Sequence, residues 1–158
     1  MTTLVVHIAE AAAEAGEQVA IVDTEPRHDA MTLCIIDTAP HAAPDATRVA
    51  RAVDGVVIPC RPTALDRAAA GNAVDLIKAA GTPAVFVRSA GPFRAPETAE
   101  SRPILSDYGL RVAPVTLTER RAFARAVATG RAVTEFEPDG KAAEEVRTLW
   151  PWLKEPLS

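Results

Sequence analysis

Short apolar runs alternate along the chain with segments whose apolar residues recur at helical spacing. Continuously apolar runs, which predict buried strands, lie near residues 19–23, 33–37, 55–59, 84–88 and 111–114. Segments of helical periodicity cover residues 3–15, 43–53, 63–81, 97–109, 119–130 and 140–150. Apolar strands separated by helices are typical of an α/β domain with a parallel, or mainly parallel, sheet of about five strands.

Several residues mark where the helices start, break or pack. Thr118 and Asp139 precede the last two helical segments and are expected to act as N-caps. Pro103 is expected to interrupt the helix at 97–109 because proline lacks the backbone N–H. The helix at 63–81 is expected to line one side with Leu65, Ala69, Leu76 and Ala80.

Composition narrows the class of protein. The chain has 158 residues, of which 48% are hydrophobic and 24% charged, so we expect a single domain over residues 1–158. Its net charge of −4 argues against a wholly basic nucleic-acid coat. Cys34 and Cys60 form no Cys-x-x-Cys pair, and no apolar run approaches membrane-spanning length. These features favour a cytoplasmic protein without a membrane partner.

Polar residues follow four of the predicted strands. They are Asp23 to Glu25, Asp37 to Pro40, Pro59 to Pro62, and Arg88 with Ser89. The carboxyl ends of parallel strands meet at one edge of the sheet, and ligands of open α/β sheets bind there. The placement therefore predicts a ligand site, although each tail taken alone could be an ordinary strand terminus.

A basic segment lies at 111–134, with five arginines, one acidic residue and a net charge of +4. Within the helix expected there, Arg121 and Arg125 are four residues apart and share a face. Phe123 and Val127 lie roughly opposite, so we expect that side to pack. The arginine side suits DNA phosphate. The alternative is a solvated amphipathic helix with no partner.

Four segments together resemble the ParA/MinD family of deviant Walker ATPases, and the ParA chromosome and plasmid partition branch most closely. They are VAIVDTEP, IIDTAP, VVIPCRPTALD and the stretch from Val112 to Glu145, so the match covers nearly the whole chain. The resemblance implies a three-layer, P-loop-NTPase-like (SIMIBI-type), mainly parallel sheet flanked by helices. The basic region at 111–150 would belong to the same domain.

Two parts of the family pattern are shortened. MTTLVVHIA resembles the tail of the phosphate loop, with Met1 where the family has its lysine, so we expect the Walker A glycines and lysines and the N-terminal strand to be lacking. Only eight residues, 25–32, join two strands that the family separates by a helical crossover. We expect apolar surface to be exposed as a result.

The resemblance also implies roles for individual residues. Thr2 and Asp37 would hold Mg²⁺, Glu25 and Asp37 would be catalytic, and the ATP-binding residues would be Thr2, Thr3, Asp23, Pro40 and Ser89. Three positions depart from the family: Glu25 replaces an Asp, Arg27 a Gln, and Ser89 an Asn that contacts adenine. The longer side chain of Glu25 places its carboxylate one methylene further out.

The function implied is that of a ParA-like partition protein. We expect it to hydrolyse ATP poorly and to act through dimerisation and sequence-independent DNA binding by Arg120, Arg121, Arg125 and Arg131. Its expected partners are itself or an intact ParA homologue, DNA, and a ParB-like centromere-binding protein, which would associate it with the nucleoid. The alternatives are an active partition ATPase, if a P-loop is supplied upstream, or a truncated gene product without a role.

Overall fold

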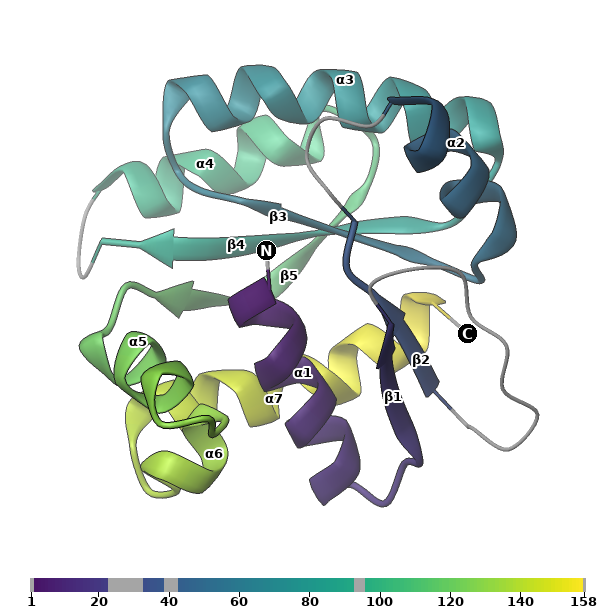
Figure 1. Cartoon of the computed structure of the whole chain (residues 1–158). Coiled ribbons are helices and arrows are strands. Elements are labelled where there is room, and N and C mark those ends of the chain that lie inside the picture. Colours follow the sequence, from purple (N-terminus) through teal and green to yellow (C-terminus); the bar gives the residue numbers. More distant parts are fainter. Residues whose placement is uncertain (1, 23–32, 39–42, 93–95, 158) are drawn as a thin grey trace. The chain divides into compact units, whose positions relative to one another are not determined.

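The computed structural model describes residues 2–22, 33–38, 43–92 and 96–157 (Figure 1). The chain forms two compact units. The first comprises Met1–Pro40 with Arg120–Trp150, and the second His41–Glu119 with Pro151–Ser158. The single domain over residues 1–158 stays a prediction.

The first unit contains two strands and the helices packed around them. Its elements are α1 (Thr2–Glu14), β1 (Val19–Val22), β2 (Leu33–Ile36), α5 (Arg121–Ala128), α6 (Val133–Phe136) and, as far as Trp150, α7 (Lys141–Leu157). The two strands pair in parallel, with Val19 opposite Leu33 and Val22 opposite Ile36. None of these eight strand residues is fully buried. The prediction of buried strands is therefore wrong for this pair, although exposed apolar surface was expected from the shortened crossover.

The first helix sets the direction of the strand that follows it. α1 buries Ile8, Ala11 and Ala12, and ends where Gly16 adopts a left-handed φ of 92° and donates to the carbonyl of Ala13 at 2.9 Å. The chain therefore turns back at once, and α1 packs against β1. Because β2 is parallel to β1, the start of α1 lies at the same end of the unit as the carboxyl ends of both strands.

The second unit contains a three-stranded parallel sheet in the order β3–β4–β5. Its elements are α2 (Ala43–Ala52), β3 (Val56–Cys60), α3 (Ala64–Ala80), β4 (Ala84–Gly91), α4 (Pro96–Ser106), β5 (Arg111–Thr118) and the last residues of α7. Figure 1 shows α3 and α4 along one face of the sheet. The core between them is built around Phe86, Val74, Ile77 and Leu105.

The α/β class and parallel strands at the five predicted positions are confirmed. The single sheet is wrong: in the described part of the chain the strands form one sheet of two and one of three. Several helix details are wrong. Pro103 does not interrupt α4, which runs on to Ser106. Beyond Pro103 the buried Leu105 anchors the last turn, and the N–H of Asp107 donates to the Pro103 carbonyl at 3.1 Å. Thr118 is not at the N-cap position of α5, because β5 continues to Thr118 and the N-cap residue is Arg120. Gly140, rather than Asp139, directly precedes α7.

The face that α3 turns to the core also differs from the prediction. Its buried residues are Ala70, Val74 and Ile77, whereas the predicted Ala69 is exposed and Leu76 is half-buried. One residue rotates a helix by about 100°, so the predicted stripe lies one position away from the true one. At the helix start, Thr63 accepts the N–H of Asp66 at 3.1 Å and donates its hydroxyl to the Asp66 carboxylate at 2.6 Å.

Candidate functional site

The first unit brings three of the predicted site residues to one end. Asp37 directly follows β2, and its backbone N–H extends the ladder by donating to the carbonyl of Val22 at 3.2 Å. Its carboxylate is half-buried, with one oxygen shielded from solvent. Thr2 and Thr3 open α1 at the same end, where the first backbone N–H groups of the helix have no partner within the helix. A carboxylate and a positive helix end suit a metal ion and a phosphate respectively.

Other predicted site residues lie elsewhere or are not placed. Asp23, Glu25 and Pro40 fall outside the described residues. Ser89 belongs to the second unit, where it is half-buried in β4 opposite Leu117 of β5. Among the residues that the structure does describe, no three His, Cys, Asp or Glu side chains gather into a metal-binding group.

Arg88 is part of the fold rather than of a strand tail. β4 continues to Gly91, and the Arg88 guanidinium is buried, donating to the carbonyls of Thr98 at 2.9 Å and Pro114 at 3.3 Å. Burial, with a smaller contribution from nearby Arg102, lowers the pKa of Arg88. The side chain thereby joins α4 to β5. A charged residue inside the apolar run PAVFVRS was the signal in the sequence.

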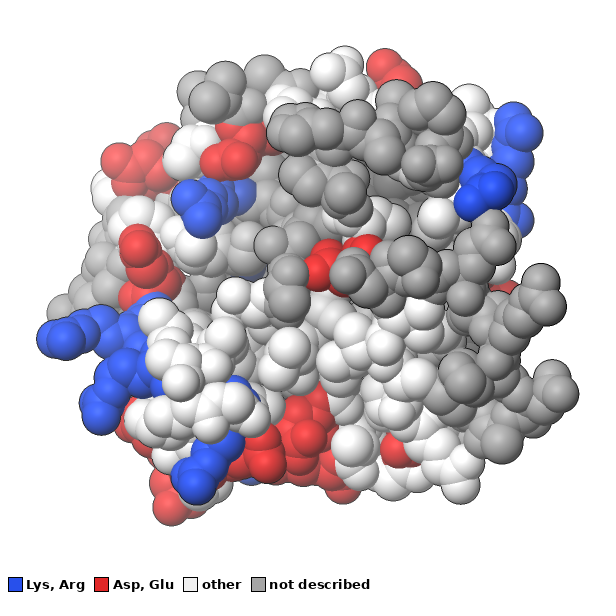
Figure 2. Space-filling view, in the orientation of Figure 1, with Lys and Arg blue, Asp and Glu red and all other residues white. Residues whose placement is uncertain are grey.

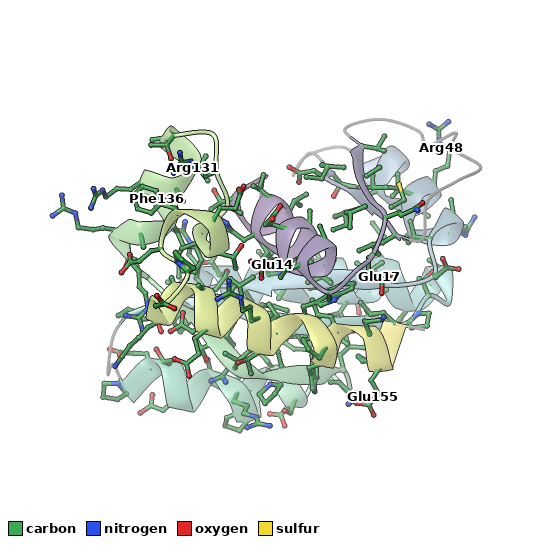
Figure 3. All side chains as sticks on the ribbon, turned by 90° about the horizontal axis from the view of Figure 1, so that it is seen from below. Glu14, Glu17, Arg48, Arg131, Phe136 and Glu155 are labelled. Atoms are coloured by element: carbon green, nitrogen blue, oxygen red, sulfur yellow. The ribbon has the colours of Figure 1, made fainter. Side chains whose placement is uncertain are left out.

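The basic helix α5 presents its arginines unequally. Arg121 and Arg125 are exposed, and the Arg125 guanidinium lies 5.3 Å from the ring centre of Phe136. Arg131 is exposed in the turn before α6, as Figure 3 shows beside Phe136. Arg120 instead donates to the Glu145 carboxylate from Nη2 at 2.8 Å and Nε at 3.3 Å. Figure 2 shows Lys and Arg side chains gathered over this part of the first unit.

The expected apolar face of α5 is only partly correct. Phe123 is half-buried, but Val127 is 41% exposed. The residue that packs completely is Ala126. The exposed arc of α5 therefore carries apolar as well as cationic side chains.

His7 holds α1 to the segment that carries the arginines, and sequence reasoning missed this role. Its buried ring accepts the N–H of Val133 on Nδ1 at 3.0 Å and lies 5.1 Å from the ring of Phe123. Burial lowers the pKa of His7 to about 4. The acceptor role of Nδ1 and the low pKa agree, because both require a neutral imidazole.

None of the helices that the structure describes has the length and apolar character needed to span a bilayer. No protein-family model matches the chain, and no curated protein matches it significantly in sequence.

Solved structures do resemble it. A crystal structure of the Pyrococcus furiosus cell division ATPase MinD matches with a TM-score of 0.77 and 13% identity, over 98% of this chain and 92% of that one. A partition protein matches with a TM-score of 0.45 and 18% identity, over 75% of this chain and 37% of its own. The first match shows that the chain has a MinD-like P-loop NTPase fold, with parallel sheets flanked by helices.

Proposed function

We propose that the chain is a ParA/MinD-type partition protein that binds DNA without sequence preference and works as a pair, with itself or with an intact ParA homologue. The fold and the four family-like segments support this proposal. The observation that carries it is the group of exposed guanidinium groups at α5 and the turn after it, from Arg121, Arg125 and Arg131. A ParB-like centromere-binding protein is the proposed regulatory partner.

The charges of this group are available to an external anion. Within the described part of the chain, Arg121 and Arg131 form no ion pair or hydrogen bond, and Arg125 contacts only the ring of Phe136. Arg120 contributes less, because its guanidinium already bonds to Glu145. Exposed guanidinium groups pair with phosphates of any sequence and release counterions as they do so.

ATP with Mg²⁺ is the ligand that the family resemblance implies, and some residues at the first unit's strand ends fit it. The Asp37 carboxylate would hold the metal ion, and the backbone N–H groups at Thr2 and Thr3 would receive phosphate oxygens. Binding of ATP, rather than its hydrolysis, would favour the paired state of the subunits. Hydrolysis is proposed to be negligible, because Glu25 and Ser89 replace the family residues that position water and adenine.

The first prediction tests DNA binding by fluorescence anisotropy on two unrelated duplexes. The double change Arg121→Ala with Arg125→Ala should weaken binding to both equally. It should also reduce the slope of log K against log salt by about 1.8, corresponding to two phosphate contacts. The matched control is Arg51→Ala, an exposed arginine on α2 of the second unit, which should change neither quantity.

Two results would count against this function. If the wild-type protein does not bind either duplex at low salt, the exposed arginines have another role. If the double variant loses affinity for only one duplex, the arginines read bases rather than phosphates.

A further inference from the structure

A shallow hollow of about 400 Å³ opens on the surface of the first unit. Five apolar residues line it, Val6, Ala9 and Ala13 of α1 and Val19 and Ile21 of β1. Ile21 is 48% exposed, which makes it one of the most exposed large apolar side chains that the structure describes. We call this surface the α1–β1 groove.

Two carboxylates also line the α1–β1 groove. Glu10 and Glu135 line it, together with Gly130 and Ala132. The Glu135 carboxylate accepts the N–H of Ala132 at 2.9 Å, whereas Glu10 has no hydrogen-bond or ion-pair partner among the described residues. Figure 2 shows carboxylates beside uncharged surface in this region. Burial, followed by repulsion from Glu135 and Glu14, raises the pKa of Glu10.

These features indicate the chemistry of a surface that would bind in the α1–β1 groove. An occupant must bring apolar side chains for the five apolar residues and cations for the two carboxylates. A cation there would relieve the repulsion between the two carboxylates, and an apolar side chain would remove Ile21 from water. A surface segment with both features is already present in this chain, on α5.

The exposed arc of α5 complements the groove in both respects. Val127, Ala124 and Ala128 share it with Arg121 and Arg125, and together they span roughly 160° of the helix surface. α5 has eight residues and is about 12 Å long. One edge of its arc is thus apolar and the other cationic.

We propose that α5 of a second copy of this chain docks in the α1–β1 groove, with Val127 against its apolar residues and the arginines of α5 against Glu10 and Glu135. Gly130 and Ala132 follow α5 and line the groove, so each copy carries helix and groove side by side. Two copies related by a two-fold axis can therefore exchange the same contact twice. The contact requires neither DNA nor nucleotide.

The test is sedimentation velocity of the full chain without DNA or nucleotide, over protein concentrations up to about 1 mM. The wild-type protein should dimerise, and rising salt should weaken the dimer. A groove variant, Glu10→Lys with Glu135→Gln, and a helix variant, Arg121→Glu with Arg125→Glu, should each associate at least roughly tenfold more weakly. The change Glu135→Gln keeps an oxygen to accept the N–H of Ala132.

Mixing the two variants distinguishes docking from loss of fold. In the mixed pair, the groove that carries Glu10→Lys meets the helix α5 that carries Arg121→Glu and Arg125→Glu, so the charges are again opposite. The unchanged groove and helix also meet, so association should return. An independent variant, Val127→Asn, should weaken the dimer, whereas Ile104→Asn should not. Ile104 lies on α4 of the second unit and is 39% exposed against 41% for Val127, so it is a matched control.

Three outcomes would overturn the inference. The wild-type protein could be monomeric at all concentrations, the charge variants could dimerise like the wild type, or the mixture could fail to restore association. Docking would occupy Arg121 and Arg125, which are also the proposed DNA contacts, so the docked pair is the DNA-free form. Because the assay contains no DNA, each of these results leaves the proposed DNA binding to its own test.

Discussion

His7 shows how one buried side chain can make the stability of this fold depend on pH. The ring links α1 to the start of α6 and to Phe123 of α5. It can do so only while Nδ1 is unprotonated, and burial disfavours the charged form. The pKa of His7 is therefore about 4 in the folded chain, well below the value of about 6.5 for an unperturbed histidine.

We predict that the folded state loses stability as the pH falls from about 6.5 towards 4. In that interval the unfolded chain binds more protons than the folded one, so the contribution of His7 is present above 6.5 and declines below it. The loss should be on the order of 2 kcal/mol at pH 5 and should level off below pH 4. Urea unfolding at pH 7.5 and pH 5 measures it.

The control for this prediction is His7→Gln, which can still accept the N–H of Val133 but does not titrate in this range. Its stability should change less with pH than that of the wild type. If the two proteins show parallel curves, another group controls the acid response.

At the scale of elements, α3 shows that a helix can be recognised locally while its orientation is decided by packing. The periodicity and the residues at its start predicted the helix within one residue at each end. Its core face differs from the predicted one because Phe86 of β4 and Leu105 of α4 pack against Val74 and Ile77. These neighbours come from later in the chain.

We predict that Ile77→Ala lowers the free energy of unfolding by about 2–4 kcal/mol, since it leaves a cavity in a buried cluster. The same truncation one position earlier, Leu76→Ala, should cost clearly less, because that side chain is only half-buried. Chemical denaturation of the two variants compares them directly. Equal losses would mean that the helix turns a different face to the core.

At the scale of the whole molecule, the local charge of two surfaces differs from the net charge of the chain. The chain has a net charge of −4, yet exposed arginines gather on α5 and in the turn that follows it, and Glu10 and Glu135 line the α1–β1 groove. A nucleotide site would need cationic groups for the phosphates and a carboxylate for Mg²⁺ at the carboxyl ends of β1 and β2. There the structure describes Asp37 and the start of α1.

We predict weak ATP·Mg²⁺ binding, with a dissociation constant above about 1 mM, and negligible hydrolysis. Phosphate bound by backbone groups and one carboxylate lacks the side-chain cations that make such contacts strong. Calorimetry with a slowly hydrolysed ATP analogue measures the affinity. Micromolar binding that disappears in an Asp37→Ala variant would contradict the prediction.

The sequence by itself determined the class of fold, the five parallel strands and the approximate position of most helices. These features follow from local patterns, because a continuously apolar run flanked by helices has few alternatives to a buried parallel strand.

Only the tertiary structure decided which side chains pack, pair or remain exposed. The hydrogen-bond partners of Arg88 lie 10 and 26 residues away in the chain, and the donor to His7 lies 126 residues away. Arg120 is paired because α7 brings Glu145 against it. Val127 is exposed because the described elements around α5 leave it uncovered. Burial and pairing depend on segments that fold together from distant parts of the chain, and no local pattern records them.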